Sequence, residues 1–198
     1  MQPTTHSIST GLAFQTPDGR AYTLRRVTPA DVGRLAEFLS RLSQKTRWLR
    51  FMTPRPFSPE LVRAEVARIV AGGAGSYVAL IVTESHAGEA AAAVAELACD
   101  HDSATGEIAV VVRDDAQRKG IGGLLMRQLV QIAQELGLTH LHGDMLAENY
   151  PMRHLLRSLG LPSTTTIHSG EMHVIIGMPQ REEMLSHAQP PCMAQVVA

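Results

Sequence analysis

Residues Glu107 to Gly123 read EIAVVVRDDAQRKGIGG, and this stretch decides how the chain folds. The apolar run predicts a buried strand, and the periodic apolar residues from Ile121 onward predict a long amphipathic helix. The basic, glycine-rich turn between them directs free backbone N–H groups and a positive helix end at one point. Such a point suits phosphate or pyrophosphate, and glycine lets the backbone approach the ligand closely. Arg118 and Lys119 add two positive charges beside it.

Two common phosphate-binding patterns do not fit this turn. The P-loop requires Gly-x-x-x-x-Gly-Lys-Ser/Thr, which the chain lacks, and the dinucleotide pattern Gly-x-Gly-x-x-Gly fails because Leu125 occupies its third glycine position. An ordinary strand-to-helix turn is the structural alternative. A basic first turn opposes the helix dipole, so a purely structural turn would more often carry Asp or Glu. The composition of the turn therefore favours an anionic ligand.

Composition limits the class of protein. The 198 residues are 44% hydrophobic, enough for one domain over 1–198, with a core of about 21–179 and loose tails at 1–15 and 180–198. A formal net charge of -1 gives no global basic field for nucleic acid. No apolar run approaches the roughly 20 residues of a membrane helix. Cys99 and Cys192 suggest neither a disulfide framework nor a zinc site, so we expect free thiols in the cytoplasm.

Hydrophobic periodicity predicts the order of the elements. Thr28, Pro29 and Asp31 indicate a helix start, and Ser58 with Pro59 indicates a second. The expected strands span 21–27, 77–83, 91–99, 107–113, 139–146, 164–167 and 171–178, the last two forming a hairpin around Ser169–Gly170. The expected helices follow Thr28 (with Val32, Leu35, Ala36, Leu39 and Leu42 inward), Ser58, Gly120 and Asn149 (with Met152, Leu155, Leu156 and Leu159 inward).

This order predicts an α+β fold with one mixed, mostly antiparallel sheet flanked by helices. His140, His142 and Asp144 alternate and should share one face of their strand. Ligands at every second residue of one strand need a further group from elsewhere to hold a metal, so we predict polar or structural histidines and no metal site.

Two motifs give the chain its resemblance to a known family. Gln117-x-x-Gly120-x-Gly122 after an apolar strand resembles the acyl-CoA-binding motif of the GNAT N-acetyltransferase superfamily. Residues 149–161, NYPMRHLLRSLGL, resemble that family's Asn-x-x-Ala-x-x-Leu-Tyr-x-x-x-Gly-Phe segment and occur at the family's spacing. The resemblance covers about residues 21–178 and implies the GNAT fold, acetyl-CoA as cosubstrate and an amine as acceptor.

Three further segments resemble the transferase domain of bacterial Pat-type protein lysine acetyltransferases. Residues 43–52, SQKTRWLRFM, are similar to their Ser-x-x-Ser-x-Tyr-x-Arg-Phe segment, although a helix end packing Trp48, Leu49 and Phe51 explains the same pattern. Residues 107–113 resemble their Glu-Phe-Ala-x-x-Val-Arg strand, and 148–152 resemble Glu-Asn-x-Pro-Met. A protein lysine is therefore the acceptor that the resemblance implies.

The same resemblance assigns roles to individual residues. Glu107, expected to open its strand, would be the general base; the alternative is a solvated residue at a hairpin end. Asn149 would contact the pantetheine arm, cap its helix, or do both. The expected cofactor-binding residues are Val110, Val111 and Val112 on the strand, Gln117, Arg118, Lys119, Gly120, Ile121, Gly122 and Gly123 in the turn, and Asn149.

One family position departs from its pattern. Leu156 stands where the family often has a Tyr that protonates the departing thiolate, and Tyr150 is not an obvious substitute. A thiolate with a pKa near 8.5 can leave without such an acid. A small-amine acetyltransferase and a non-catalytic acyl-CoA-binding module therefore remain alternatives, and the sequence leaves open whether the protein forms a homodimer.

Overall fold

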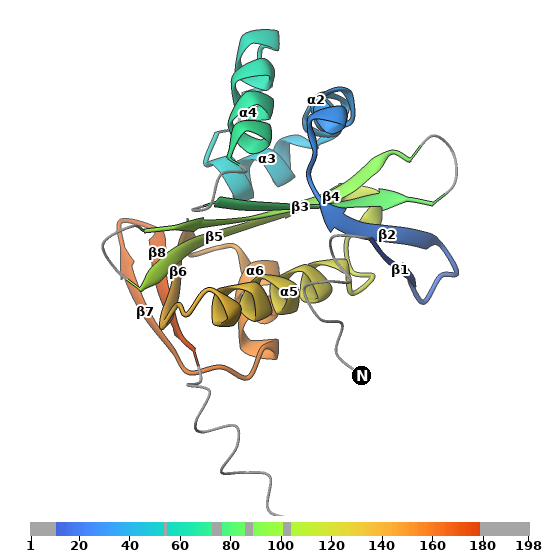
Figure 1. Ribbon diagram of the computed structural model, residues 1–198. Helices are drawn as coiled ribbons and strands as arrows, with labels where there is room; N and C mark the ends of the chain where they lie inside the picture. The colour runs from blue at the N-terminus through green and yellow to red at the C-terminus, as the bar shows by residue number, and fades with distance from the viewer. Residues whose placement is uncertain (1–10, 54, 73–76, 86–88, 101–103, 179–198) are drawn as a thin grey trace, which may run out of the picture.

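One sheet separates two layers of helices in this protein (Figure 1). The computed structural model describes residues 11–53, 55–72, 77–85, 89–100 and 104–178. Within them, eight strands follow the order β1-β2-β3-β4-β5-β6-β8-β7, and helices α2, α3 and α4 cover one face while α5 and α6 cover the other. Every neighbouring pair is antiparallel except β5 and β6. The expected α+β fold with a mixed, mostly antiparallel sheet is confirmed.

The first part of the chain supplies one edge of the sheet and one helical layer. Thr28 receives its expected capping box, since its backbone N–H donates to Asp31 (2.9 Å). Ser58 caps α4 as its Ser-Pro start predicts, accepting from the Leu61 N–H at 3.3 Å. The elements are β1 Leu12–Gln15, β2 Ala21–Arg26, η1 Pro29–Asp31, α2 Val32–Arg41, α3 Gln44–Phe51 and α4 Pro59–Ala71.

Three features of this region differ from the sequence-based expectation. Leu12–Gln15 is not a loose tail, because it pairs with Ala21–Arg26 as strand β1. The segment after Leu42 is a separate helix, α3, because Ser43 caps it by accepting from the Thr46 N–H at 3.1 Å. Val32 is 50% exposed and stands outside the buried stripe of α2, where Leu35, Phe38 and Leu39 face inward.

The central strands are long and buried. They are β3 Tyr77–Glu84, β4 Ala91–Cys99 and β5 Thr105–Val112. Strand β5 begins two residues before Glu107, so this residue lies within the strand and does not open it. Cys99 is a free thiol in β4, whereas Cys192 lies outside the described residues, as does the expected tail at 180–198.

The last part of the chain completes the second helical layer and the other edge of the sheet. Its elements are η2 Asp114–Ala116, α5 Ile121–Glu135, β6 His140–Leu146, α6 Tyr150–Ser158, β7 Ser163–His168 and β8 Glu171–Gly177. Ser169 and Gly170 both have positive φ (51° and 86°), as a tight hairpin turn between β7 and β8 requires. The predicted hairpin is confirmed.

Each face of the sheet has its own hydrophobic core. On one face α2 and α4 pack against Ile81, Val94 and Val111. On the other face α5 buries Ile121, Leu125 and Leu129 almost completely, and each such side chain contributes about 1.5–3 kcal/mol on burial. Met152, Leu155 and Leu156 of α6, and Leu159 directly after it, pack against this second core and are partly buried, as their spacing predicts. Strand β5 lies between both cores, which fixes its position firmly.

Candidate active site

The parallel strands β5 and β6 pair over only three residues before they separate. Their pairs are Thr105 with His140, Gly106 with Leu141, and Glu107 with His142. Strand β5 stays paired with β4 on its other edge up to Val112, and β6 stays paired with β8 up to Leu146. The sheet therefore opens into a V after Glu107, with the second half of β5 along one side.

Backbone alternation shows which groups of β5 face this V-shaped opening. Arg113 N–H donates to Ala92 O (2.8 Å), so the odd-numbered residues of this strand bond to β4. Thr139 N–H donates to Ala104 O (2.7 Å), so the even-numbered residues face β6. Val110 and Val112 thus direct their backbone groups into the opening, whereas the backbone of Val111 bonds to β4. An extended ligand arm can pair with the first two as an added strand would.

The glycine-rich turn at the end of β5 has the backbone geometry expected of an anion site. Gly120 is the N-cap of α5 with φ of 85°, and no side chain caps this helix end. The first intrahelical bond runs from Leu124 N–H to Gly120 O (3.0 Å), so the amides of Ile121, Gly122 and Gly123 have no helical acceptor. No acidic residue lies in the first turn of α5. This geometry fits a phosphate at the positive end of the helix dipole.

The side chains of the turn have other partners. Gln117 donates through Nε2 to Val112 O and to Thr46 Oγ1, both at 3.0 Å. Lys119 pairs with Asp18 (2.7 Å), and this bond lowers the pKa of the Asp18 carboxyl well below its usual range. Arg118 is exposed and has a positive φ of 59°. The backbone of the turn, together with Arg118, is thus the part left for a ligand.

Asn149 caps α6 and also holds α3. Its Oδ1 accepts from Met152 N–H (3.1 Å), and its Nδ2 donates to Leu49 O (3.3 Å). The side chain is buried, being 7% exposed. The capping role expected from the sequence is therefore confirmed, and a contact with α3 is added to it.

Glu107 lines a cavity of about 330 Å³ on the α3–α4 side of the sheet. Its carboxylate is exposed and forms no ion pair with any residue that the structure describes. The cavity walls are Arg50, Phe51, Met52, Glu65, Arg68, Tyr77, Glu96, Ala98, Glu107, Ile108 and Ala109. Carboxylates outnumber guanidinium groups by one among these residues, which favours a cationic ligand.

A buried carboxylate that the sequence analysis missed organises this cavity. Glu96, 5% exposed, accepts from Arg50 (2.9 Å), from Arg68 (2.5 Å) and from the Tyr77 hydroxyl. Burial and the charge of Glu96 raise the pKa of Tyr77. Glu96 stands in an alanine-rich strand, and this isolated charge was the only sequence signal for it.

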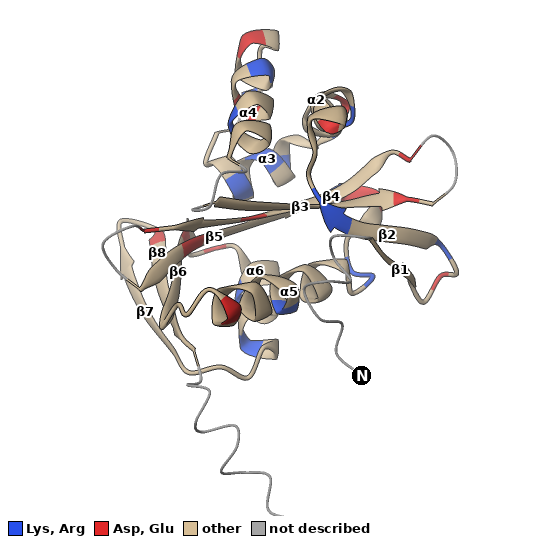
Figure 2. Ribbon diagram, viewed as in Figure 1, with Lys and Arg blue, Asp and Glu red and all other residues tan. Residues whose placement is uncertain are grey.

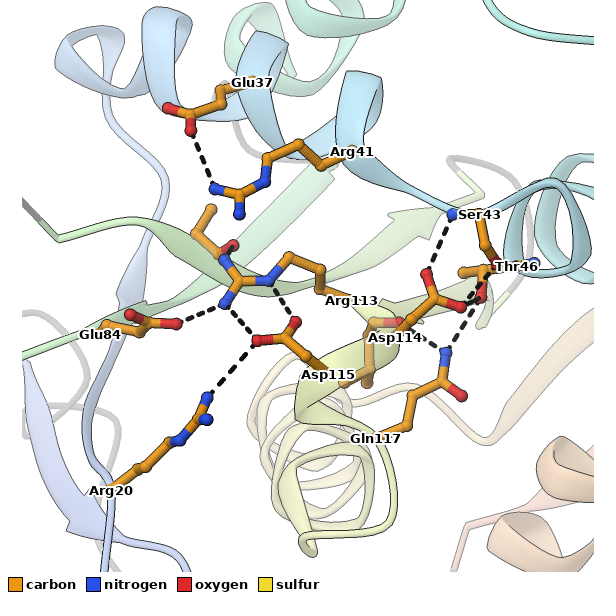
Figure 3. Close-up of polar contacts among 12 residues, drawn as sticks. Arg20, Glu37, Arg41, Ser43, Thr46, Glu84, Arg113, Asp114, Asp115 and Gln117 are labelled. Atoms are coloured by element: carbon orange, nitrogen blue, oxygen red, sulfur yellow. Dashed lines mark hydrogen bonds and ion pairs between the residues drawn. The ribbon is translucent and has the colours of Figure 1, made fainter. Parts of the chain in front are cut away.

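A second polar network fixes the end of β5 (Figure 3). Arg113 is 6% exposed; its guanidinium donates to Ala91 O (2.8 Å), to Asp115 (2.5 and 2.9 Å) and to Glu84. The bonds from Arg113 lower the pKa of the Asp115 carboxyl. The neighbouring Asp114 turns the other way, toward Ser43 and Thr46 of the α3 start. Lys/Arg and Asp/Glu are interspersed over the helices and strands of the whole fold (Figure 2).

The alternating histidines of β6 lie on one face, as expected. His140 and Asp144 are exposed and His142 is half-buried, while the residues between them are buried. His173 of β8 bonds to Asp144 (2.8 Å). Among the described ranges, no three His, Cys, Asp or Glu side chains are grouped so as to hold a metal ion. In that same part of the chain, no helix is both long and apolar enough to cross a membrane.

The described residues thus bring together a V-shaped opening, an uncapped helix end and an acidic cavity. Comparison with known proteins identifies the family. The profile of the acetyltransferase (GNAT) domain matches residues 22–162. The acetyltransferase PA5475 of Pseudomonas aeruginosa is 30% identical over 159 residues, covering 76% of this chain and 84% of that protein. The chain belongs to the GNAT acetyltransferase family.

Relatives called Pat are similar as well. The acetyltransferase Pat of Mycolicibacterium smegmatis is 28% identical over 151 residues, which are 76% of this chain but only 44% of that protein. The GNAT domain of S. lividans PAT has the same fold, with a TM-score of 0.73 over 89% of this chain and 99% of that one, at 19% identity. A cAMP-binding acyltransferase from Mycobacterium smegmatis aligns with a TM-score of 0.55 at 25% identity, and this chain spans 51% of it.

Proposed function

We propose that the protein transfers the acetyl group of acetyl-CoA to a primary amine, with a protein lysine as the leading acceptor. The observation that carries this proposal is the position of Glu107, at the last pair of β5 and β6 and in the wall of an acidic cavity. The side chain of Glu107 lines the cavity, and the V-shaped opening between β5 and β6 begins directly after this residue. A base at such a junction can serve an amine and a thioester brought together there.

In this proposal acetyl-CoA lies along the V-shaped opening, from the glycine-rich turn to the branch point at Glu107, where β5 and β6 separate. The free amides of Ile121, Gly122 and Gly123 suit its pyrophosphate. The backbone groups of Val110 and the N–H of Val112 suit its pantetheine arm, whereas Val112 O already accepts from Gln117. A Cβ added at Gly122 would contact Leu155 Cδ2 at 3.4 Å, so the turn lies close to α6 and leaves little room for a side chain at this position. Bound acetyl-CoA would supply the activated acyl group, with CoA leaving as the thiolate.

Glu107 would handle the proton of the acceptor. A lysine ammonium has a pKa near 10.4 and cannot attack until it loses a proton, which a carboxylate in the cavity wall is placed to accept. Glu107 is the one cavity carboxylate without an ion-pair partner among the described residues, whereas Glu65 and Glu96 are bonded to arginines. The surplus negative charge of the cavity attracts the ammonium group before this step.

Mass spectrometry tests the function and its acceptor class together. The protein would be incubated with acetyl-CoA and a cell lysate, and separately with a panel of small primary amines, using protein with Glu107→Gln as the matched control. New acetyl-lysines that depend on Glu107 would support the proposal. Acetylation of small amines alone would assign the small-amine alternative, and binding of acetyl-CoA without any transfer would assign the acyl-CoA-binding module.

A further inference from the structure

Helix α3 is fastened at its first turn to the segment that carries the glycine-rich turn. Asp114 Oδ1 accepts from Ser43 Oγ (2.6 Å) and from Thr46 Oγ1 (2.7 Å), and Oδ2 accepts from Ser43 N–H (3.0 Å). Burial opposes the charge of Asp114, but these bonds outweigh it and lower the pKa of the carboxyl. The ionised carboxylate of Asp114 therefore holds the start of α3 through these hydrogen bonds (Figure 3).

Gln117 makes the same connection from inside the turn. Its amide donates to Thr46 Oγ1 and to Val112 O, so Thr46 bonds to the turn and to Asp114 at once. Thr46 is buried, at 8% exposure. A change in the backbone of the turn on ligand binding would therefore reach α3 through two hydrogen-bonded side chains.

The other end of α3 forms a wall of the acidic cavity. Arg50, Phe51 and Met52 line that cavity, and Arg50 bonds to Glu96 at its centre (2.9 Å). Midway, Trp48 Nε1 donates to Glu148 Oε1 (2.8 Å) at the β6–α6 junction. Since α3 has eight residues, it is about 12 Å long and transmits a shift of its first turn to its last.

We propose that Asp114 is a positioning residue that couples acetyl-CoA binding at the turn to acceptor binding in the cavity, acting through α3. This inference rests on the proposed function, in which the turn and the cavity hold the two substrates. When the turn closes on the pyrophosphate, Asp114 and Gln117 fix the first turn of α3, and Arg50 is held where the cavity is best formed. The amine therefore binds better to the protein with acetyl-CoA than to the free protein.

The adjacent Asp115 provides a matched control. It is the same residue type in the same short helix η2, but it bonds to Arg113 and Arg20 and, within the part of the chain that the structure describes, forms no hydrogen bond with α3. Asp114→Asn and Asp115→Asn would each remove one charge at nearly the same distance from the turn. Only the first would release α3.

Steady-state kinetics and calorimetry on the full chain test the inference. Asp114→Asn should raise KM for the amine roughly 10-fold while Kd for acetyl-CoA in the absence of amine stays unchanged. Asp115→Asn, which removes a bond from the Arg113 network but none from α3, should leave KM for the amine unchanged at a temperature where it is folded. An unchanged KM in Asp114→Asn, or an equal rise in Asp115→Asn, would overturn the positioning role.

Hydrogen exchange provides a readout that needs no turnover. In the wild-type protein, acetyl-CoA should slow amide exchange across 44–51, and in Asp114→Asn it should bind without slowing that segment. If acetyl-CoA binds the wild type and leaves exchange in 44–51 unchanged, the coupling is wrong. If no amine is ever acetylated but this Asp114-dependent slowing is seen, the proposed function fails while the coupling stands.

Discussion

The two parts of strand β5 differ in sequence, TGE and then IAVVV, and they differ in their surroundings. Thr105 to Glu107 are paired on both edges, with β4 and with β6, whereas residues 108–112 are paired with β4 alone. At the branch, Gly143 of β6 lies so close to β5 that an added Cβ would stand 3.1 Å from Ile108 O. The contrast shows that the candidate site lies where β5 loses its second partner strand, β6, and keeps only β4. The proposed function then depends on few side chains, and it assigns the main role to Glu107 at the branch.

The largest expected effect comes from changing the branch residue itself. Glu107→Gln keeps the size of the side chain and removes its basicity, so turnover at neutral pH should fall roughly 10²–10⁴-fold while acetyl-CoA affinity holds. The loss should shrink at high pH, where more of the amine is already neutral. Steady-state rates across pH measure both effects.

Glu171→Gln is the control for this change. Glu171 is an exposed carboxylate at the start of β8, in the part of the sheet that stays fully paired at that residue. Its loss should not alter turnover. If Glu107→Gln keeps near wild-type turnover at neutral pH, Glu107 is not the general base and is a solvated residue of the strand.

The next effect concerns the turn that follows the open half of β5. Gly122→Glu would place a side chain and a negative charge where the pyrophosphate should lie, and like charges at close range cost several kcal/mol, so acetyl-CoA affinity should fall at least about 100-fold. Calorimetry measures the affinity, and circular dichroism checks the fold. Gly33→Glu in α2, where nothing lies within 4 Å of an added Cβ, should bind normally. Equal affinities of Gly122→Glu and wild type would exclude this turn as the binding site.

A change at Gly143 probes the branch point between the two halves. Gly143→Ala forces a methyl group toward Ile108 O, a backbone atom that cannot rotate away, and should cost about 1–3 kcal/mol of stability. Urea unfolding measures this cost, with Gly33→Ala as a helix control that should gain stability. No loss in Gly143→Ala would mean that β5 and β6 can separate further without strain.

Much of the fold was predictable because local patterns govern it. The periodicity of α5, the Ser58-Pro59 start of α4 and the Ser169–Gly170 hairpin all agree with the structure. The glycine-rich turn was predictable for the same reason, because its glycines and the start of α5 are neighbours in the sequence.

Features that depend on distant residues were not predictable. Strand β1 is short, and it is stabilised by its pairing with β2 and by the packing of Leu12 and Phe14 against the core. The start of α3 is set by Asp114, 71 residues from Ser43, and the cavity cluster joins Glu96 to Arg50 across 46 residues. Spacing along one sequence carries no record of such contacts, so the resemblance motifs included Arg50 and Glu107 of the cavity wall but gave no sign of Glu96 at its centre.

The smallest expected effect is on the shape of the pH–rate curve. Leu156 is half-buried in the α5 core at the position where the family often has Tyr, so no phenol there protonates the thiolate. The curve should show one ascending limb, and a descending limb near pH about 10 should be absent. Such a limb, abolished by Tyr150→Phe in folded protein, would instead make the exposed Tyr150 the acid.

The most direct test of the account is residue-resolved amide exchange along β5 with and without acetyl-CoA. The central claim is that acetyl-CoA pairs with the free edge of residues 108–112. Exchange at Val110 and Val112 should slow strongly on binding, whereas Val111, already bonded to β4, should be slow in both states. If acetyl-CoA binds and the Val110 and Val112 amides exchange as fast as before, the V-shaped opening is not the acetyl-CoA site.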